Sequence, residues 1–235
     1  GRLDKHNMVD NVIFSPRANL RFNPTQNINL RLSYSSGFRA PQAFDEDMHI
    51  ENVGGTVAMI ERAKDLKEEK SQSFSVSADM YHRFGAFQTN LLIEGFYTRL
   101  TDVFVLGEPY DRGDGILVKT RSNGPGAKVM GLTLEGKVAY LSILQIQAGL
   151  TLQRSRYDEP HKWHDDAPAE KKIFRTPDTY GYFTATCTPI KPLSIALSGT
   201  YTGRMLVQRM DITAENAEQG EMPERKAEAI RTPRF

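Results

Sequence analysis

The chain has 235 residues, which is enough for one large domain or two small ones. Its 30 basic and 29 acidic residues nearly cancel, which argues against the strong positive field of a nucleic-acid-binding domain. The single cysteine, Cys187, excludes an internal disulfide framework and a cysteine-based zinc site. No apolar run reaches the ~18–20 residues of a membrane-spanning helix, although membrane β-barrels stay possible because their signal per strand is weak.

Alternating apolar and polar residues predict that most of the chain forms β-strands. The expected strands, in chain order, span residues 12–22, 28–35, 73–80, 87–97, 132–140, 144–153, 178–188 and 193–202. Pro16 lacks a backbone donor, so it predicts a bulge or a strand end inside the first of them. Residues Met59 to Leu66 are expected to form one or two helical turns.

Strand length and connection length together predict the architecture. Most strands run ~10–14 residues, against ~5–6 in soluble sheets, and a tilted strand needs ~9–11 residues to cross a bilayer. Short turns near residues 24, 84, 141 and 190 alternate with long polar loops at 37–66, 101–126, 158–177 and 206–233, the second loop holding a short extended piece at 116–119. This pattern predicts an all-β fold, an antiparallel up-and-down sheet of about eight strands from an outer-membrane barrel with short periplasmic turns and long extracellular loops. The rival interpretation is a soluble β-sandwich or adhesin-like binding module, whose strands also have one apolar and one polar face.

Two motifs flank the first long loop. The strand before the loop ends in Gly37-Phe38-Arg39-Ala40-Pro41, and the next strand begins with Leu66-Lys67-Glu68-Glu69-Lys70-Ser71. This pair resembles the TonB-dependent outer-membrane receptors, in which a strand ends in Gly-Phe-Arg-Ala-Pro and the next opens with Leu-Lys-Pro-Glu-Lys/Thr-Ser. Glu68 stands where the family usually has proline. We expect the motif to shape the exit of the strand at the outer rim rather than to bind a ligand.

The resemblance extends over the whole chain in the order of strands and loops. It implies a 22-stranded barrel closed by an N-terminal plug domain, of which residues 1–235 would be the C-terminal portion, without the plug, the early strands and the final strand. The implied function is import of a bulky, scarce nutrient (a ferric siderophore, cobalamin or an oligosaccharide) across the outer membrane of a Gram-negative bacterium. The implied partners are outer-membrane lipid, the plug of the same protein, periplasmic TonB acting through the absent N-terminal part, and a small-molecule or chelate substrate, with no nucleic acid.

Few residues suggest chemistry of their own. Residues 161–166 (His-Lys-Trp-His-Asp-Asp) have the side chains of a transition-metal site, but a polar loop tip is the favoured interpretation, so no metal is expected. Neither a nucleophile–base set nor a cofactor motif is found, so no enzyme and no cofactor are predicted. We expect aromatic and charged residues at loop tips to contact the ligand, namely Tyr110, Arg112, His161, Trp163 and His164.

Charged residues within the strands predict which face lines the barrel lumen. On a lipid face, an arginine or lysine near the midplane costs ~2–4 kcal/mol. The sequence therefore predicts that one set of charges lines the lumen and meets the plug: Arg17, Arg21, Arg31, Asp79, Glu94, Glu135, Lys137 and Arg154.

Overall fold

The computed structural model describes residues 1–5, 12–41, 58–107, 110–113, 117–162, 167–213 and 224–233. All regular structure in these ranges is β-strand. Within them, no helix is long and apolar enough to cross a membrane.

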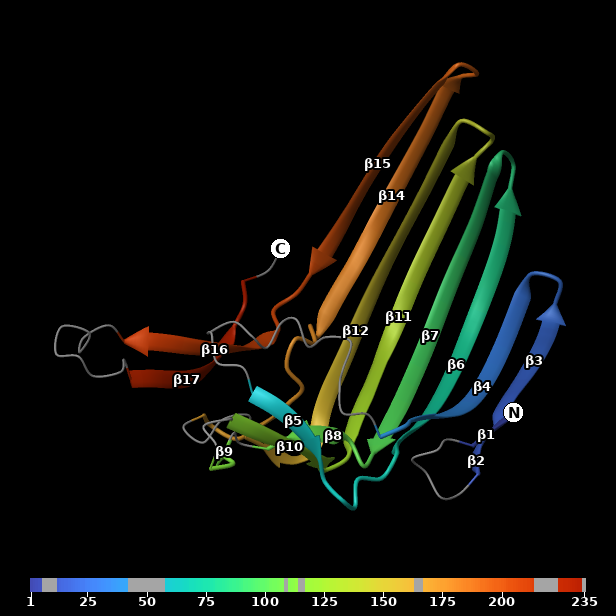
Figure 1. Ribbon diagram of the computed structural model, residues 1–235. Helices are drawn as coiled ribbons and strands as arrows, with labels where there is room; N and C mark the ends of the chain where they lie inside the picture. The colour runs from blue at the N-terminus through green and yellow to red at the C-terminus, as the bar shows by residue number, and fades with distance from the viewer. Residues whose placement is uncertain are drawn as a thin grey trace.

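Eight long strands form one curved sheet, which we call the wall (Figure 1). They are β3 (Arg17–Thr25), β4 (Ile28–Arg39), β6 (Glu69–Phe84), β7 (Phe87–Thr101), β11 (Ala127–Tyr140), β12 (Leu144–His161), β14 (Thr179–Ile190) and β15 (Leu193–Thr202). Their order in the sheet is their order in the chain, and each pairs antiparallel with the next. The predicted up-and-down antiparallel sheet is confirmed.

The two ends of the wall differ. At the turn rim, uppermost in Figure 1, short turns at 26–27, 85–86, 141–143 and 191–192 join the strands in pairs. Gly85 has φ +58°, a left-handed conformation that glycine adopts without steric cost, so it suits the second of these turns. All longer connections lie at the opposite end, the looped rim, as the alternation predicts.

One side of the wall is apolar and exposed. Leu32, Val76, Gly95, Leu132 and Leu152 lie in direct register across five strands. Val76 is 59% exposed, and similar apolar rows cross the rest of the sheet. A contiguous apolar surface of this extent needs to be covered, and lipid covers it in a membrane barrel.

The other side is polar. Cross-strand hydrogen bonds join the Ser73 and Thr98 hydroxyls at 2.9 Å and the Thr133 and Thr151 hydroxyls at 3.0 Å. The predicted lumen charges lie in this polar register, except Arg154, which is opposite Met130 and two residues beyond Leu152. The prediction for Arg154 was wrong because strand alternation keeps it on the apolar side, at the looped end.

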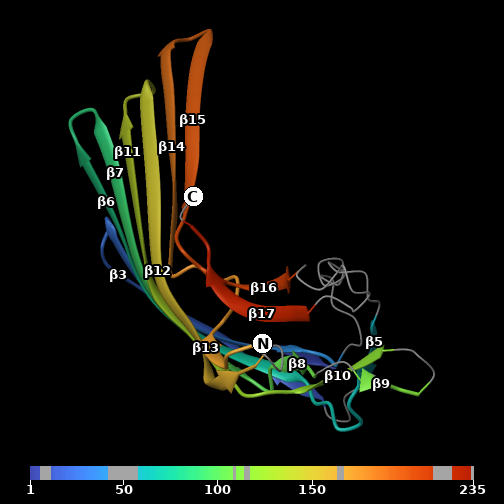
Figure 2. The same cartoon turned by 90° about the vertical axis from the view of Figure 1, so that its left-hand side faces the viewer.

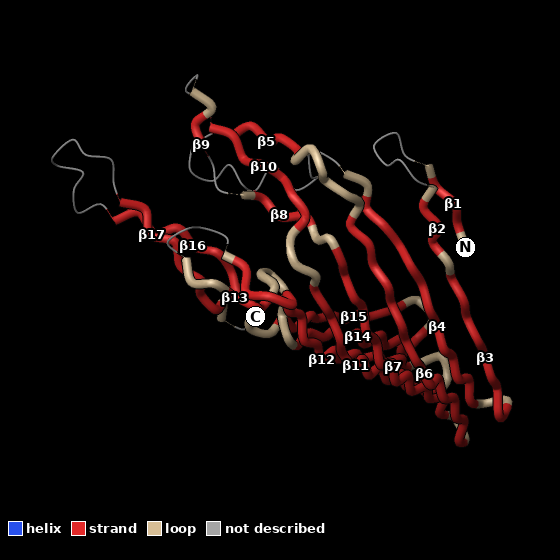
Figure 3. Tube along the Cα trace, turned by 90° about the horizontal axis from the view of Figure 1, so that it is seen from below, coloured by secondary structure: helices blue, strands red, loops and turns tan. Residues whose placement is uncertain are grey.

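The looped rim contains strands that the sequence did not predict. A four-stranded loop sheet combines β5 (Ala58–Arg62), β8 (Phe104–Leu106), β9 (Tyr110–Asp111) and β10 (Leu117–Asn123). The remaining strands are β1 (Arg2–Asp4), β2 (Ile13–Ser15), β13 (Glu170–Lys172), β16 (Leu206–Thr213) and β17 (Glu224–Arg231), of which β1 pairs with β2, β13 with β12, and β16 with β17. Figures 2 and 3 show the loop sheet and the β16–β17 hairpin on the same, concave side of the wall.

The local structure agrees with some sequence predictions and differs from others. Pro16 separates β2 from β3, so the predicted strand end is confirmed. The extended piece predicted at 116–119 is confirmed at 117–119, which begin β10, and residue 116 lies outside the described residues. The helical turns expected at Met59–Leu66 are wrong, since β5 occupies 58–62 and pairs with β10. The loops expected at 158–177 and 206–233 also contain strands, because backbone pairing with neighbours outweighs their polar composition.

Candidate functional site

The loop sheet joins two connections that are far apart in the sequence. β5 comes from the connection between β4 and β6, whereas β8, β9 and β10 come from the one between β7 and β11. β5 and β10 run parallel, with Met59 opposite Val118 and Glu61 opposite Thr120. Val118 is fully buried, so the two connections share a small core. We call the loop sheet, together with the residues that connect its strands, the loop cap.

Asn123, at the end of β10, links the loop cap to the chain just before β6 and just after β7. Its Oδ1 accepts a hydrogen bond from the Lys67 backbone N–H at 2.8 Å. Its Nδ2 donates to the backbone carbonyls of Lys67 at 3.1 Å and Asp102 at 2.8 Å. One half-buried amide therefore satisfies backbone groups of both connections.

The two sequence motifs meet at the junction of wall and cap. Phe38 lies opposite Lys70, and Arg39 lies opposite Glu69, in the last pairs of the β4–β6 ladder. A Glu69 carboxylate oxygen accepts a hydrogen bond from the Phe104 backbone N–H at 3.0 Å, and the Arg39 guanidinium carbon lies 5.5 Å from the centre of the Phe104 ring. The motif residues thus contact β8, the first strand of the second connection.

The rest of the motif is packed into the same junction. Ala40 and Pro41 are buried directly after β4. Burial would raise the pKa of the Glu68 carboxyl, but its backbone hydrogen bond and the Lys70 ammonium at 3.0 Å outweigh that effect and lower the pKa. Glu68 therefore supplies a charge, in place of the family's proline, where the chain enters β6.

The predicted ligand residues fall into two groups. Tyr110 and Arg112 lie in the loop cap, where Tyr110 is 47% exposed and the Arg112 Nη1 is 3.4 Å from a Glu61 carboxylate oxygen. His161 ends β12 instead, opposite Glu170 of β13. Trp163 and His164 lie outside the described residues.

The His161 ring contacts the ring of Tyr157 on the same strand. Its ring centre lies 5.6 Å from that of Tyr157, at 55° between the ring planes. Burial lowers the pKa of the His161 imidazole because the charged form is desolvated. At neutral pH the ring is therefore an uncharged hydrogen-bonding group at the looped rim.

The side chains that could hold a metal ion were compared over the described ranges only. In those ranges no three His, Cys, Asp or Glu side chains gather as a metal site would require. Most of the 161–166 cluster, at residues 163–166, lies outside the described ranges.

Sequence reasoning did not single out Phe104 or Asn123. Phe104 stands in a connection without strand periodicity, and Asn123 precedes a Gly-Pro-Gly run that reads as a turn. Their importance follows from contacts across 21, 35 and 56 residues of sequence, which join Asp102 to Asn123, Glu69 to Phe104 and Lys67 to Asn123. No local signal identifies such contacts.

Comparison with known proteins places the chain. Residues 1–214 match the family described as TonB dependent receptor-like, beta-barrel. The chain belongs to the TonB-dependent receptor family. The resemblance seen in the two motifs is thus confirmed, and the soluble β-sandwich is not favoured. No curated protein sequence matches the chain.

Solved structures of similar fold include a transporter and two receptors whose names refer to iron or to a siderophore. A mutant of the ferric enterobactin receptor PfeA from Pseudomonas aeruginosa matches with a TM-score of 0.64 at 16% identity, covering 99% of this chain and 32% of that one. The FrpB iron transporter from Neisseria meningitidis matches with 0.62 at 17% identity, covering 97% and 32%. The siderophore receptor PirA from Acinetobacter baumannii matches with 0.62 at 12% identity, covering 98% and 35%. At these identities the likeness shows the fold, and the chain spans about a third of the length of those structures.

Proposed function

We propose that this chain is the C-terminal part of a Gram-negative outer-membrane receptor that imports a ferric siderophore. The observation that supports the proposal is the loop cap, an ordered sheet on the concave side of a membrane-type wall. Several structures with the same fold carry names of iron or siderophore receptors. Cobalamin and oligosaccharides are the other substrates that such a receptor takes.

In this proposal the loop cap supplies ligand contacts. Tyr110 presents an exposed aromatic ring, and Arg112 a guanidinium that is 42% exposed despite its ion pair. Aromatic rings stack on flat ligand groups, and guanidinium groups bind anionic oxygens with two parallel hydrogen bonds. His161, Trp163 and His164 are proposed as further contacts from the connection that follows β12.

The remaining parts take the roles that the family implies. The polar side of the wall, with Arg31, Glu94 and Glu135 in its register, would contact a plug domain of the same protein. TonB in the periplasm would act on that plug through the N-terminal part of the protein. The motif at 37–41 and 66–71 would hold the loop cap on the wall rather than touch the ligand.

An uptake assay tests this function. The full-length receptor is produced in a Gram-negative host that lacks its own siderophore receptors, and radioactive iron uptake is measured with ferric catecholates and ferric hydroxamates. We expect uptake of at least one chelate, and we expect it to be lost in a host without TonB. Uptake of cobalamin or an oligosaccharide, with no uptake of any iron chelate, would refute the proposal that the substrate is a ferric siderophore. Uptake of the chelate in a host without TonB would refute the proposal that transport depends on TonB.

A further inference from the structure

The apolar side of the wall ends, at the looped rim, in a row of positive charges. Arg99, Lys128, Arg156 and Lys172 are directly opposed on β7, β11, β12 and β13. Like charges opposed across neighbouring strands are destabilising. A row of four therefore needs anions beside it.

Two carboxylates neutralise part of this row. The Asp158 oxygens lie 3.1 Å from an Arg99 Nη2 and 3.3 Å from the Lys128 Nζ. An Asp178 oxygen lies 2.6 Å from the Lys172 Nζ. None of these ion pairs includes Arg156.

The unmatched cations gather around a hollow of about 290 Å³. Among the described residues, no ion pair is formed by Arg154, Arg156 or Lys171, all of which are exposed. They line this hollow together with Lys128, Met130, Tyr157 and Asp158, whose carboxylate is already paired with Arg99 and Lys128. Phosphate oxygens accept several charge-assisted hydrogen bonds at once, and arginine matches their geometry with two donors. The hollow therefore has the donors of a phosphate site.

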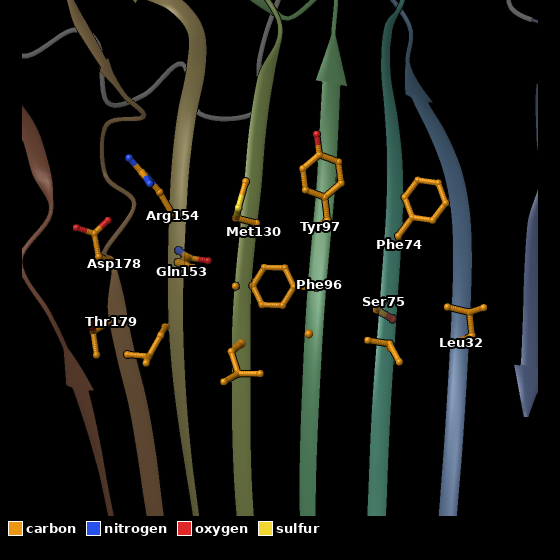
Figure 4. A pocket seen from close by; sticks show the side chains of 15 residues that line it. Leu32, Phe74, Ser75, Phe96, Tyr97, Met130, Gln153, Arg154, Asp178 and Thr179 are labelled. Carbon is orange, nitrogen blue, oxygen red and sulfur yellow. The ribbon is translucent and has the colours of Figure 1, made fainter. Parts of the chain in front are cut away.

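An apolar groove continues from this hollow along the wall. Met130 and Arg154 line both, and beyond them the groove is lined by Phe74, Leu132, Leu152 and other mostly apolar residues (Figure 4). Figure 4 shows Phe74, Tyr97, Met130 and Arg154 side by side on successive strands. A charged hollow that opens into an apolar groove fits a molecule with a phosphate head and an acyl chain better than free phosphate.

The height of the cluster agrees with the edge of a bilayer. From Leu144, at the turn rim, to Arg154 there are ten residue steps along β12, which at ~3.4 Å each and a tilt of ~40° rise ~26 Å. The apolar band of an outer-membrane barrel is ~25 Å tall. Arg154 thus lies at the level of the headgroups, and its long side chain reaches them while its methylenes stay in the apolar layer.

The opposite end of the same side has different side chains. At the turn rim, the Phe87 ring lies 5.4 Å from the Phe84 ring and 4.8 Å from the Tyr140 ring, centre to centre. Aromatic side chains of this kind are typical of the membrane–water interface of a barrel, and they need no cations beside them. The basic row is therefore a feature of the looped rim.

We propose that the cations around this hollow, Lys128, Arg154, Arg156 and Lys171, bind the phosphate of a lipid headgroup in the outer leaflet, with an acyl chain in the adjoining groove. The inference rests only on the apolar side of the wall facing lipid. It does not depend on which nutrient the receptor imports, so lipid binding and iron uptake fail or succeed separately.

The test measures lipid binding to the purified full-length receptor in neutral detergent. Native mass spectrometry follows three probes: short-chain phosphatidic acid, the diacylglycerol with the same chains, and inorganic phosphate as competitor. Phosphatidic acid is expected to bind and diacylglycerol to bind about tenfold more weakly or worse. Equal binding of both, or competition by inorganic phosphate at the concentrations of the lipid, overturns the proposal.

Variants separate the site from general effects. The double substitution Arg154→Gln and Arg156→Gln is expected to weaken phosphatidic acid binding at least about tenfold. Lys191→Gln removes a positive charge at the turn rim, and it is expected to leave the binding unchanged. Asp158→Asn releases two cations and is expected to tighten binding, an outcome that misfolding cannot produce. Unchanged binding in the double variant, or weaker binding in Asp158→Asn, contradicts the assignment.

Discussion

Replacing Asn123 with alanine should loosen the loop cap and leave the wall intact. The substitution removes one acceptor and two donor interactions with the backbone of Lys67 and Asp102. At ~1 kcal/mol for each hydrogen bond the three amount to ~3 kcal/mol, which partial exposure of the site reduces to ~2 kcal/mol. Because ~1.4 kcal/mol is a factor of ten, local opening of the cap should become ~30-fold more frequent.

Amide hydrogen exchange of the full-length receptor measures this opening. The Ala63 N–H donates to the Arg121 carbonyl at 2.8 Å, so its exchange reports separation of the two connections without involving the substituted side chain. Asn90→Ala is the matched control, since it removes side-chain hydrogen bonds to Asp79 and Met80 within the wall. Ala63 exchange within about twofold of the wild-type rate in Asn123→Ala would refute the reasoning, as would an equal increase in Asn90→Ala.

Three further outcomes are expected. A Cβ at Gly131 would lie 2.5 Å from a backbone oxygen of β12 and 2.6 Å from an aromatic ring, so Gly131→Ala should lower the free energy of unfolding by ~1–3 kcal/mol. A Cβ at Gly136 would have nothing within 4 Å, so Gly136→Ala should leave the free energy of unfolding unchanged. Equal losses for the two variants in thermal unfolding would contradict this. Burial lowers the pKa of His161, so its contribution to stability is complete above the unfolded pKa of ~6.5 and is lost as pH falls from there to the lower folded value. The protection factors of the β13 amides, which are corrected for the intrinsic pH dependence of exchange, should fall over this range and should stay constant in His161→Gln. An NMR titration midpoint of His161 above the ordinary value would overturn the sign. Tyr110→Ala should weaken binding of the ferric ligand about tenfold, because the ligand loses an aromatic contact. Tyr201→Ala, on the apolar side of the wall, should leave the binding unchanged. Equal effects of the two variants in a binding titration would show that Tyr110 does not contact the ligand.

The wall could be predicted because its signal is local. Phe74, Val76 and Ala78 alternate with Ser73, Ser75 and Ser77, and a strand shows such alternation wherever its two sides meet different surroundings. Each of the eight wall strands begins or ends near a turn or a polar run that the chain displays directly. Strand extent was less predictable, since β12 continues to His161 through residues of mixed polarity.

The loop cap could not be predicted in the same way. β5 has five residues, and its partner β10 lies about sixty residues later in the chain, in a parallel arrangement that no turn between them specifies. Met59 to Leu66 therefore reads as helical turns when only its neighbours in sequence are considered. The same applies to β16 and β17, whose pairing from Leu206–Arg231 to Thr213–Glu224 outweighs a polar composition.

The position of the family motif explains why it identifies the family and not the ligand. Arg39 and Glu69 are the last opposed pair of the β4–β6 ladder, and both reach Phe104 at the start of the neighbouring connection. These contacts fix the position at which a loop leaves the wall. Every loop must leave the wall at such a position, whatever its length or ligand. Ligand contacts depend instead on the residues farther out, such as Tyr110. We infer that receptors sharing this junction keep the motif while their loop caps differ. Exchange of residues 42–65 and 105–122 between two receptors, with Phe104 kept, should therefore transfer ligand choice without loss of the barrel.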